Sequence, residues 1–155
     1  MNLLKKTKTL IKKHLLPRRW LFVDDNRQPP LHLSRIFDTV KNYEEFVEYI
    51  ESYGIPELIS LDHDLHLEHT NYFFDNGGFL ETPDPLYANF KFKTGYDCAK
   101  YLIDYCNKTG KNLNTIIVHS QNPKGQINIY NLVTNYQIER YNKINCRIMS
   151  WKNLD

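Results

Sequence analysis

The sequence lacks the long apolar runs and paired cysteines that mark membrane proteins and disulfide-rich proteins. No stretch of its 155 residues approaches the roughly 20 consecutive apolar residues that span a bilayer. The three cysteines are widely spaced and include no Cys-x-x-Cys pair, which disfavours a disulfide scaffold or a zinc knuckle. We therefore expect a protein without a transmembrane segment, placed in a reducing compartment such as the cytoplasm.

Acidic residues are absent from the first 19 positions, MNLLKKTKTLIKKHLLPRR, which hold seven Lys and Arg residues. Removing these seven from the 20 basic residues leaves 13 against 18 acids, so the remainder carries a net charge of −5. Apolar residues recur here at helical spacing, but a sustained apolar core and a small-residue cleavage site are missing, which disfavours a secretory signal. We predict a basic amphipathic N-terminal helix over residues 1–19 that docks on its own domain or on a partner subunit of a homo-oligomer. Contact with nucleic acid or a membrane surface is the alternative.

Residues 20–155 alternate short apolar runs with amphipathic segments, which indicates one α/β domain. The runs RWLFVDD, IFDTV, PELISLD, LNTIIVHS and INCRIMSW predict five strands. The segments NYEEFVEYIESYG, TGYDCAKYLIDYCNKTG and NPKGQINIYNLVTNYQIERYN predict three helices, with Asn42 and Gly54 bounding the first and Pro123 opening the third. Because strands that alternate with helices pair in parallel, we predict an open parallel sheet of about five strands with helices on both faces.

Residues 66–93, HLEHTNYFFDNGGFLETPDPLYANFKFK, fit neither pattern and predict a long loop inside this domain. Loops of this length in a compact domain are usually either functional or disordered. Seven Phe and Tyr residues argue against disorder. We predict a flap over the strand ends that could stack on a nucleobase, with ordinary packing onto the domain as the alternative.

Polar residues follow directly after three of the predicted strands, in FVDD, ISLDHD and IVHS. Ligands of open α/β sheets bind outside the carboxyl ends of the strands, so these polar groups should meet at one edge of the sheet. A few carboxylates, completed by water and a substrate phosphate, suit Mg²⁺ or Mn²⁺. The alternative is that these acids only cap helices or face water. The predicted metal ligands are Asp24, Asp25, Asp62 and Asp64.

Two histidines, His63 and His119, lie beside these acids and predict proton transfer, because imidazole titrates near neutral pH. His66 and His69 form an H-x-x-H pair, but no fourth zinc ligand accompanies them. We therefore expect His66 and His69 to be loop residues. The predicted catalytic residues are Asp62, His63, His119 and Ser120.

Phosphate-binding groups are predicted at two places near the same strand ends. Asn122 and Lys124 stand at the start of the third predicted helix, and helix N-termini bind anions. Arg27 follows the first acidic pair, and a guanidinium can hold two phosphate oxygens at once. The predicted phosphate-binding residues are Arg27, Asn122 and Lys124.

Four blocks of the sequence, FVDDNRQPP, ISLDHDL, TGYDCAKYL and VHSQNPKGQINI, resemble motifs of the cyclic-phosphate processing receiver-like family, a divergent branch of response-regulator receiver domains. The resemblance covers residues 20–135 and implies a flavodoxin-like fold. It implies that Asp24, Asp25 and Asp62 bind Mg²⁺ as the corresponding receiver acids do, with Asp62 in the place of the phosphoryl acceptor. It also implies that Ser120 contacts phosphate.

The sequence departs from ordinary receiver domains in ways that bear on function. Receivers do not need His63, Asp64 or His119, which stand here within DHD and HS. The segment between the first two strands is too short for the usual helix, and no helix is predicted after the fifth strand. The Lys expected at the end of that strand has no clear match, so Lys124 or Arg147 would have to substitute.

Two classes of function follow from these residues and from the resemblance. The first is a Mg²⁺- or Mn²⁺-dependent phosphoesterase or phosphodiesterase that acts on cyclic or terminal phosphates of nucleotides or RNA, with metal, Arg27 and Lys124 neutralising the phosphate. The second is a non-enzymatic module, either a phosphoacceptor switch or a sequestering binder of cyclic nucleotides. The additional histidines favour the enzyme, whereas the aromatic loop also suits a binder.

Overall fold

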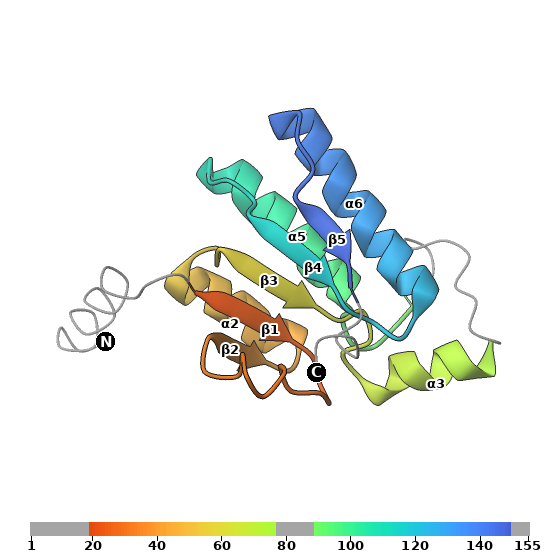
Figure 1. The fold of residues 1–155 in the computed structure, drawn as a ribbon. Coiled ribbons are helices and arrows are strands. Elements are labelled where there is room, and N and C mark those ends of the chain that lie inside the picture. The colour runs from red at the N-terminus through yellow and green to blue at the C-terminus, as the bar shows by residue number, and fades with distance from the viewer. Residues whose placement is uncertain (1–18, 77–88, 150–155) are drawn as a thin grey trace.

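The computed structural model describes residues 19–76 and 89–149 (Figure 1). The predicted basic helix over residues 1–19 falls almost wholly outside the described residues, and so does the middle of the predicted flap. No helix within the described ranges is long and apolar enough to cross a membrane.

Five short strands form one sheet, as the sequence predicts, and all of them pair in parallel. Their order is β2-β1-β3-β4-β5, so the chain runs outward in one direction from β1 to β2 and in the other from β3 to β5 (Figure 1). This confirms the open parallel α/β sheet and its receiver-like order. The strands are β1 (Trp20–Val23), β2 (Phe37–Val40), β3 (Leu58–Leu61), β4 (Thr115–Val118) and β5 (Cys146–Ile148).

Helices connect most of these strands, and their ends follow capping residues in the sequence. Asn42 accepts a hydrogen bond from the backbone N–H of Glu45 at the start of one helix, and Gly54, with φ 80°, ends it. Thr94 and Asp97 form a reciprocal capping box at the start of another. The described helices are α2 (Tyr43–Tyr53), α3 (Leu67–Asp75), α5 (Gly95–Thr109) and α6 (Pro123–Tyr141).

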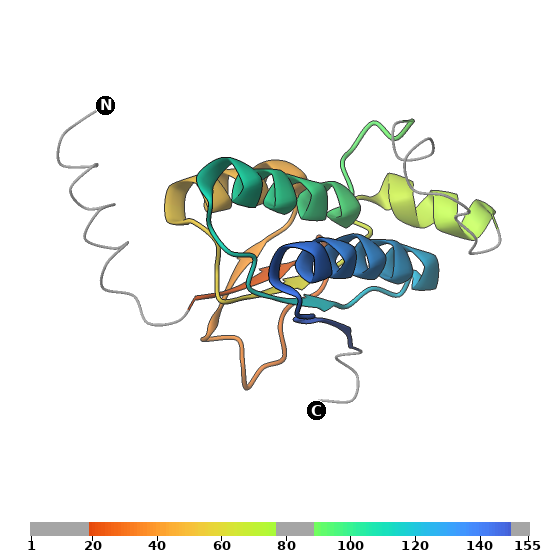
Figure 2. The same cartoon turned by 90° about the horizontal axis from the view of Figure 1, so that it is seen from above.

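The helices α2, α5 and α6 lie together on one face of the sheet (Figure 2). The prediction of helices on both faces is wrong for the described residues, and the handedness of the crossovers explains why. The connections from β2 to β3, β3 to β4 and β4 to β5 all advance in the same direction, so right-handed crossovers place their helices on the same side. Only the connection from β1 to β2 runs the other way, and residues 24–36, with Pro29 and Pro30, form no helix there.

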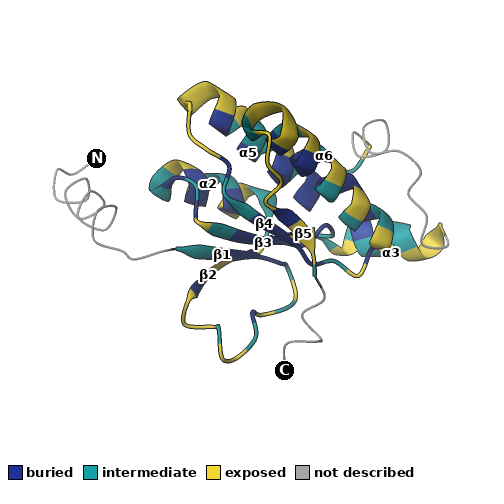
Figure 3. Cartoon of the chain, turned by 45° about the horizontal axis from the view of Figure 1, so that its top comes forward, coloured by how far each residue is buried: buried dark blue, intermediate teal, exposed yellow. Residues whose placement is uncertain are grey.

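The apolar core lies between this helical layer and the sheet, and Figure 3 shows buried residues on the strands and on the helix sides that face them. Alternate residues of the strands, such as Leu21, Ile59 and Ile116, point into it and are almost fully buried against α2, α5 and α6. The intervening residues, such as Phe22 and Ser60, belong to the opposite face of the sheet and lie outside this core cluster. This alternation determines which face the residues after each strand occupy.

The segment predicted as a loop over residues 66–93 begins instead with the helix α3, which lies beyond the carboxyl ends of the strands (Figure 1). His66 caps α3, and its ring stacks on Phe92 with the ring centroids 3.7 Å apart. The carboxylate of Glu68 accepts hydrogen bonds from the backbone N–H groups of Lys91 and Phe92, and His69 Nε2 lies 2.9 Å from the carbonyl oxygen of Phe92. The prediction of loop residues is therefore wrong for His69, which lies within α3, whereas His66 precedes the helix as its N-cap. Both rings contact Phe92 and so connect the start of α3 to the chain that follows it.

Candidate functional site

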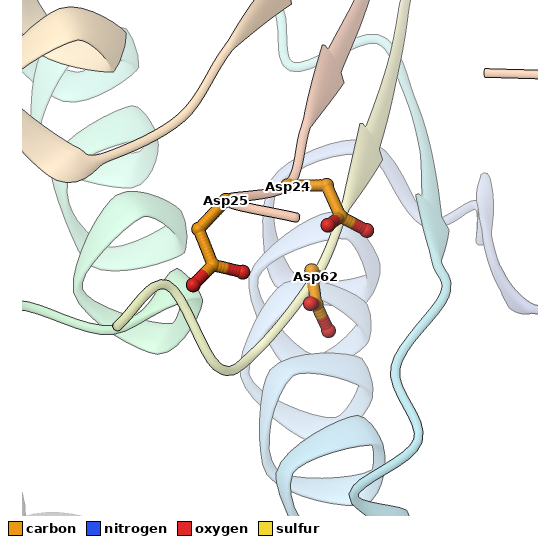
Figure 4. A group of neighbouring side chains, drawn as sticks. All are labelled: Asp24, Asp25 and Asp62. Atoms are coloured by element: carbon orange, nitrogen blue, oxygen red, sulfur yellow. The ribbon is translucent and has the colours of Figure 1, made fainter. Parts of the chain in front are cut away.

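Three carboxylates meet where β1 and β3 end. Asp24 and Asp25 follow β1, and Asp62 follows the neighbouring strand β3. The backbone N–H of Asp62 donates to the carbonyl oxygen of Val23, the last residue of β1, and so holds Asp62 beside Asp24. One oxygen from each of the three acids lies within 4.8 Å of the others (Figure 4). Asp24 and Asp62 are buried and Asp25 is partly exposed. A donor set made only of carboxylate oxygens fits Mg²⁺ or Mn²⁺ rather than a softer metal.

Asp24 is held by four hydrogen bonds. Its Oδ1 accepts from the backbone N–H groups of Asn26 (3.0 Å) and Arg27 (2.6 Å), and its Oδ2 accepts from Arg27 Nε (2.7 Å) and contacts His119 Nε2 (3.0 Å). Burial by itself raises the pKa of Asp24, but the bond from His119 and those around Arg27 outweigh it and hold the pKa at about 2. Asp24 therefore stays ionised at neutral pH, and a metal ion at this site would meet it with both of its oxygens already hydrogen-bonded.

The Arg27 guanidinium bridges two of the three acids. Its Nε lies 2.7 Å from Asp24, while its Nη2 lies 2.9 Å from Asp62 and donates to the backbone carbonyl of His119 at 3.1 Å. Burial lowers the pKa of Arg27, and the charges of Asp62 and Asp24 raise it by more, so the group stays a cation. The predicted phosphate-binding arginine is thus placed at the acids, with about a third of its side chain open to solvent.

Asp62 is the acid whose protonation is most perturbed. Burial raises its pKa from 3.8 to about 7, although Arg27 and a hydrogen bond with Ser120 oppose the rise. Its Oδ1 also accepts the backbone N–H of His63 at 2.8 Å. A carboxyl of this kind changes charge near neutral pH, where a metal ion and a proton compete for it.

His119 is buried directly after β4 and contacts Asp24. Its ring stacks on Phe22 at 4.4 Å, its Nδ1 lies 2.7 Å from Ser60 Oγ, and its Nε2 meets Asp24. Burial lowers the pKa of His119 against the opposing effect of Asp24. Sequence reasoning missed Ser60, although a lone hydroxyl within the apolar run LISL, two residues before Asp62, is a signal that strand alternation could have used.

His63 and Asp64 form a second, adjacent cluster. His63 is fully buried, and its Nδ1 lies 2.5 Å from Asp64 Oδ1, which Asn122 Nδ2 also approaches at 3.3 Å. Burial raises the pKa of Asp64, but its contacts with His63 outweigh that effect and lower it. The structure therefore separates Asp64 from the three converging acids, and it uses Asn122 to cap α6 through the backbone N–H of Gly125.

A pocket of about 390 Å³ opens over these groups. Helix α3 forms its far wall with Thr70, Phe73 and Phe74, and the Phe74 side chain is largely exposed. Neither imidazole of the predicted pair His63 and His119 lines the pocket, and Lys124 does not line it either. The wall on the sheet side comprises Asp24, Asp25, Asn26, Arg27, Asp62, Asp64, Ser120, Gln121 and Asn122.

Residues 19–135 match the model of a family described as the cyclic-phosphate processing receiver domain. The chain belongs to this family. The resemblance inferred from the four sequence blocks is thereby confirmed, and in this receiver the acids Asp24, Asp25 and Asp62 occupy the receiver site. No curated protein and no solved structure matches the chain.

Two glycines of this receiver explain why its motifs contain no larger residue. A Cβ on Gly95, in the block TGYD, would lie 1.8 Å from the carbonyl oxygen of Asp62. A Cβ on Gly125, in NPKGQ, would lie 2.3 Å from the His63 ring. Helices α5 and α6 therefore reach the site only because their first turns carry glycine.

The cation of this receiver's site differs from the sequence-based expectation. Arg147 lies exposed on β5, and neither it nor Lys124 lines the pocket. Arg27, from the connection after β1, makes the ion pair with Asp62 instead. Among the described residues, the positive charge at the acids thus comes from the β1 side of the site.

Proposed function

We propose that the chain is a metal-dependent phosphoesterase or phosphodiesterase that acts on cyclic or terminal phosphates of nucleotides or RNA. The observation that carries the proposal is the convergence of three carboxylates, with oxygens within 4.8 Å of one another, at a pocket that also presents Arg27. Membership of the cyclic-phosphate processing receiver family supports the class of substrate.

Asp24, Asp25 and Asp62 together would hold Mg²⁺ or Mn²⁺. When bound, such an ion neutralises charge on the phosphate oxygens and lowers the pKa of coordinated water. The chain itself would orient the phosphate through Arg27 on one side and through Ser120 and Asn122 on the other. Ser120 Oγ accepts the backbone N–H of Asn122 at 3.2 Å, so both groups are fixed at the start of α6, where a helix dipole favours anions.

Proton transfer is also required, because opening a cyclic phosphate takes a proton from water and gives one to the leaving alkoxide. The roles predicted for His63 and His119 stay predictions. Both rings are buried behind the pocket wall and reach it through Asp64 and Asp24 respectively. Any proton from either ring to a substrate would therefore have to pass through one of these carboxylates or through a rearranged side chain.

The wall opposite the acids favours a nucleotide over a simple phosphate ester. Phe73 and Phe74 face the pocket from α3, and the side chain of Phe74 is 70 % exposed. Stacking of a base on an aromatic side chain is worth about 1–3 kcal/mol. Phe74→Ala should accordingly weaken the binding of a cyclic nucleotide while leaving the binding of inorganic phosphate unchanged.

Incubation with a panel of nucleotides tests the proposal. The panel comprises 2′,3′- and 3′,5′-cyclic nucleotides and cyclic dinucleotides, with and without Mg²⁺ or Mn²⁺, read by mass spectrometry. We expect metal-dependent turnover that is lost in Asp25→Asn and retained in Asp104→Asn, a matched change at an exposed position of α5. Retention of a nucleotide without turnover would identify a binder, and neither turnover nor retention would refute the proposal.

A receiver-type phosphoacceptor switch is the second candidate, favoured by one specific contact. Asp62, after β3, is hydrogen-bonded to Ser120, after β4, which is the pairing of acceptor and hydroxyl that the resemblance to receivers implies. Acetyl phosphate would then label Asp62 stably in the presence of Mg²⁺. A labelled Asp62 without turnover of any cyclic phosphate would favour the switch.

The cysteines support a cytoplasmic location, which we propose on that ground alone. Cys98, Cys106 and Cys146 are free and buried. Burial raises the pKa of each of the three thiols, which keeps them protonated and unreactive. This is the expected state of structural cysteines in a reducing compartment.

A further inference from the structure

One chain of hydrogen-bonding groups runs from the middle of β3 to the acids. Ser60 is fully buried, and its Oγ lies 2.7 Å from Nδ1 of His119, whose Nε2 lies 3.0 Å from Oδ2 of Asp24. The His119 ring is 2 % exposed and is fixed in its plane by stacking on Phe22. Both ring nitrogens therefore have side-chain partners inside the protein.

The chemistry of the partners assigns the direction of each bond. The Asp24 carboxylate can only accept, so His119 Nε2 must carry the hydrogen that it donates. In a neutral imidazole the other nitrogen is then an acceptor, and the Ser60 hydroxyl donates to it. His119 in this arrangement has no free nitrogen with which to exchange a proton with a ligand in the pocket.

The contact between His119 and Asp24 also determines how the other charged side chains of the site are oriented. Asp24 Oδ2 lies between His119 Nε2 and Arg27 Nε, and the same guanidinium reaches Asp62 through its Nη2. Orienting Asp24 consequently orients Arg27 and, through it, Asp62. The backbone carbonyl of His119 accepts from Arg27 Nη2 as well, so His119 contacts this assembly at two points.

We propose that His119 is a positioning residue that, backed by Ser60, aims the Asp24 carboxylate, and that it is not the group that transfers protons to or from the substrate. The inference rests on the proposed metal and phosphate site, because its effect is felt there. It differs from the proton-transfer role that the sequence predicts for the same residue, and the two roles have different experimental consequences.

Two amide replacements separate these roles, because each reproduces one ring nitrogen. The amide nitrogen of His119→Gln reaches as far as Nε2 and can still donate to Asp24, whereas that of His119→Asn reaches only as far as Nδ1. Loss of a group that supports a metal ligand typically lowers metal affinity about 10- to 100-fold. We expect Mn²⁺ affinity, measured by electron paramagnetic resonance, to fall about 10- to 100-fold in His119→Asn and to stay within about threefold of the wild type in His119→Gln.

The outcome that overturns the inference is equal Mn²⁺ affinity in the two variants, whether both are retained or both are lost. Circular dichroism melts of both variants check the fold. Where turnover is measurable, a proton-transfer role would leave both variants equally inactive, whereas a positioning role leaves kcat and its pH profile intact in His119→Gln. A wild-type protein that binds no Mn²⁺ would refute the proposed function instead.

A measurement on the wild-type protein needs neither metal nor substrate. Long-range ¹H–¹⁵N correlation spectra of histidine-labelled protein report which ring nitrogen carries the hydrogen, and the signal of His119 is the one missing from His119→Gln. We expect the Nε2–H tautomer, and a shift of the Nδ1 resonance in Ser60→Ala. An Nδ1–H tautomer, or an Nδ1 resonance indifferent to Ser60→Ala, would overturn the inference even if the metal site proved correct.

Discussion

Replacing Asp62 by Asn removes a buried charge with almost no change in size, and it should stabilise the metal-free protein. The Asp62 side chain is 7 % exposed, and burial raises its pKa from 3.8 to about 7 against the attraction of Arg27. Between these two pH values the folded state binds more protons than the unfolded state does. The contribution of Asp62 to the stability of the wild type therefore falls as pH rises from about 4 to about 7 and is constant above that.

The size of the effect follows from the same pKa. A rise from 3.8 to about 7 corresponds to about 4 kcal/mol of stability lost above pH 7, at about 1.4 kcal/mol per pKa unit. Asp62 now accepts from Arg27 Nη2 at 2.9 Å and from the backbone N–H of His63 at 2.8 Å through different oxygens. Asn has one acceptor oxygen, so its amide NH₂ would face one of these donors, which costs about 1–3 kcal/mol. We expect a net gain of about 2 kcal/mol at pH 8, or a Tm higher by roughly 4–8 °C for a chain of this length.

Thermal and urea unfolding in EDTA at pH 5 and pH 8 measure this gain, with Asp104→Asn as the exposed control. The advantage of Asp62→Asn over the wild type should be large at pH 8 and near zero at pH 5. Added Mn²⁺ should stabilise the wild type and not the variant. The reasoning fails if the variant is less stable than the wild type at pH 8, or if the difference between them does not depend on pH.

Three further predictions use the same site and its surroundings. Below its pKa of about 7, Asp62 carries a proton that Mn²⁺ must displace, so Mn²⁺ should bind about tenfold more weakly at pH 6 than at pH 8. An affinity measured by calorimetry that does not vary with pH would contradict this. Gly125→Ala drives a Cβ to within 2.3 Å of the His63 ring and should cost at least about 2 kcal/mol in urea unfolding, whereas Asn131→Ala, at an exposed position of α6, should cost little. Deleting residues 1–18 should leave a cooperative melt, since β1 begins at Trp20, and a lost transition would show that this segment belongs to the core.

The strands and the main helices could be predicted because local signals and tertiary packing agree there. Asn42 and Gly54 bound α2 as the capping rules require, and the apolar runs became the five strands. The placement of the helices on one face of the sheet could not be predicted from hydrophobic periodicity. Periodicity shows that a helix has an apolar side, but it does not show in which direction the chain crosses from one strand to the next. Helix α3 was missed because its stability depends on distant contacts, such as those of Glu68 and His69 with residues 91–92, rather than on a strong amphipathic pattern.

The location of the candidate site could be predicted from the sequence better than the roles of its residues. The binding rule for open sheets brought the strand-end acids to one edge correctly, and the structure adds that Asp64 belongs with His63 rather than with the three converging carboxylates. What the sequence did not reveal is the side on which an imidazole lies. Strand alternation places His119 on the sheet face of Ser60, because His119 follows Ile117, the partner of Ser60, by two residues. The same rule places Asp24 and Asp62 on that face, so it does not distinguish the buried imidazole from the acids that line the pocket.

The order of the strands has a consequence for how this pocket can change. The chain leaves β1 toward one edge of the sheet and leaves β3 toward the other, so the two connections diverge at the point where Asp24 and Asp62 stand. The crevice between them is a product of backbone routing and not of the acids that line it. Substitutions of the acids would therefore leave the crevice open, and a relative without these carboxylates would keep a crevice in which a ligand could bind.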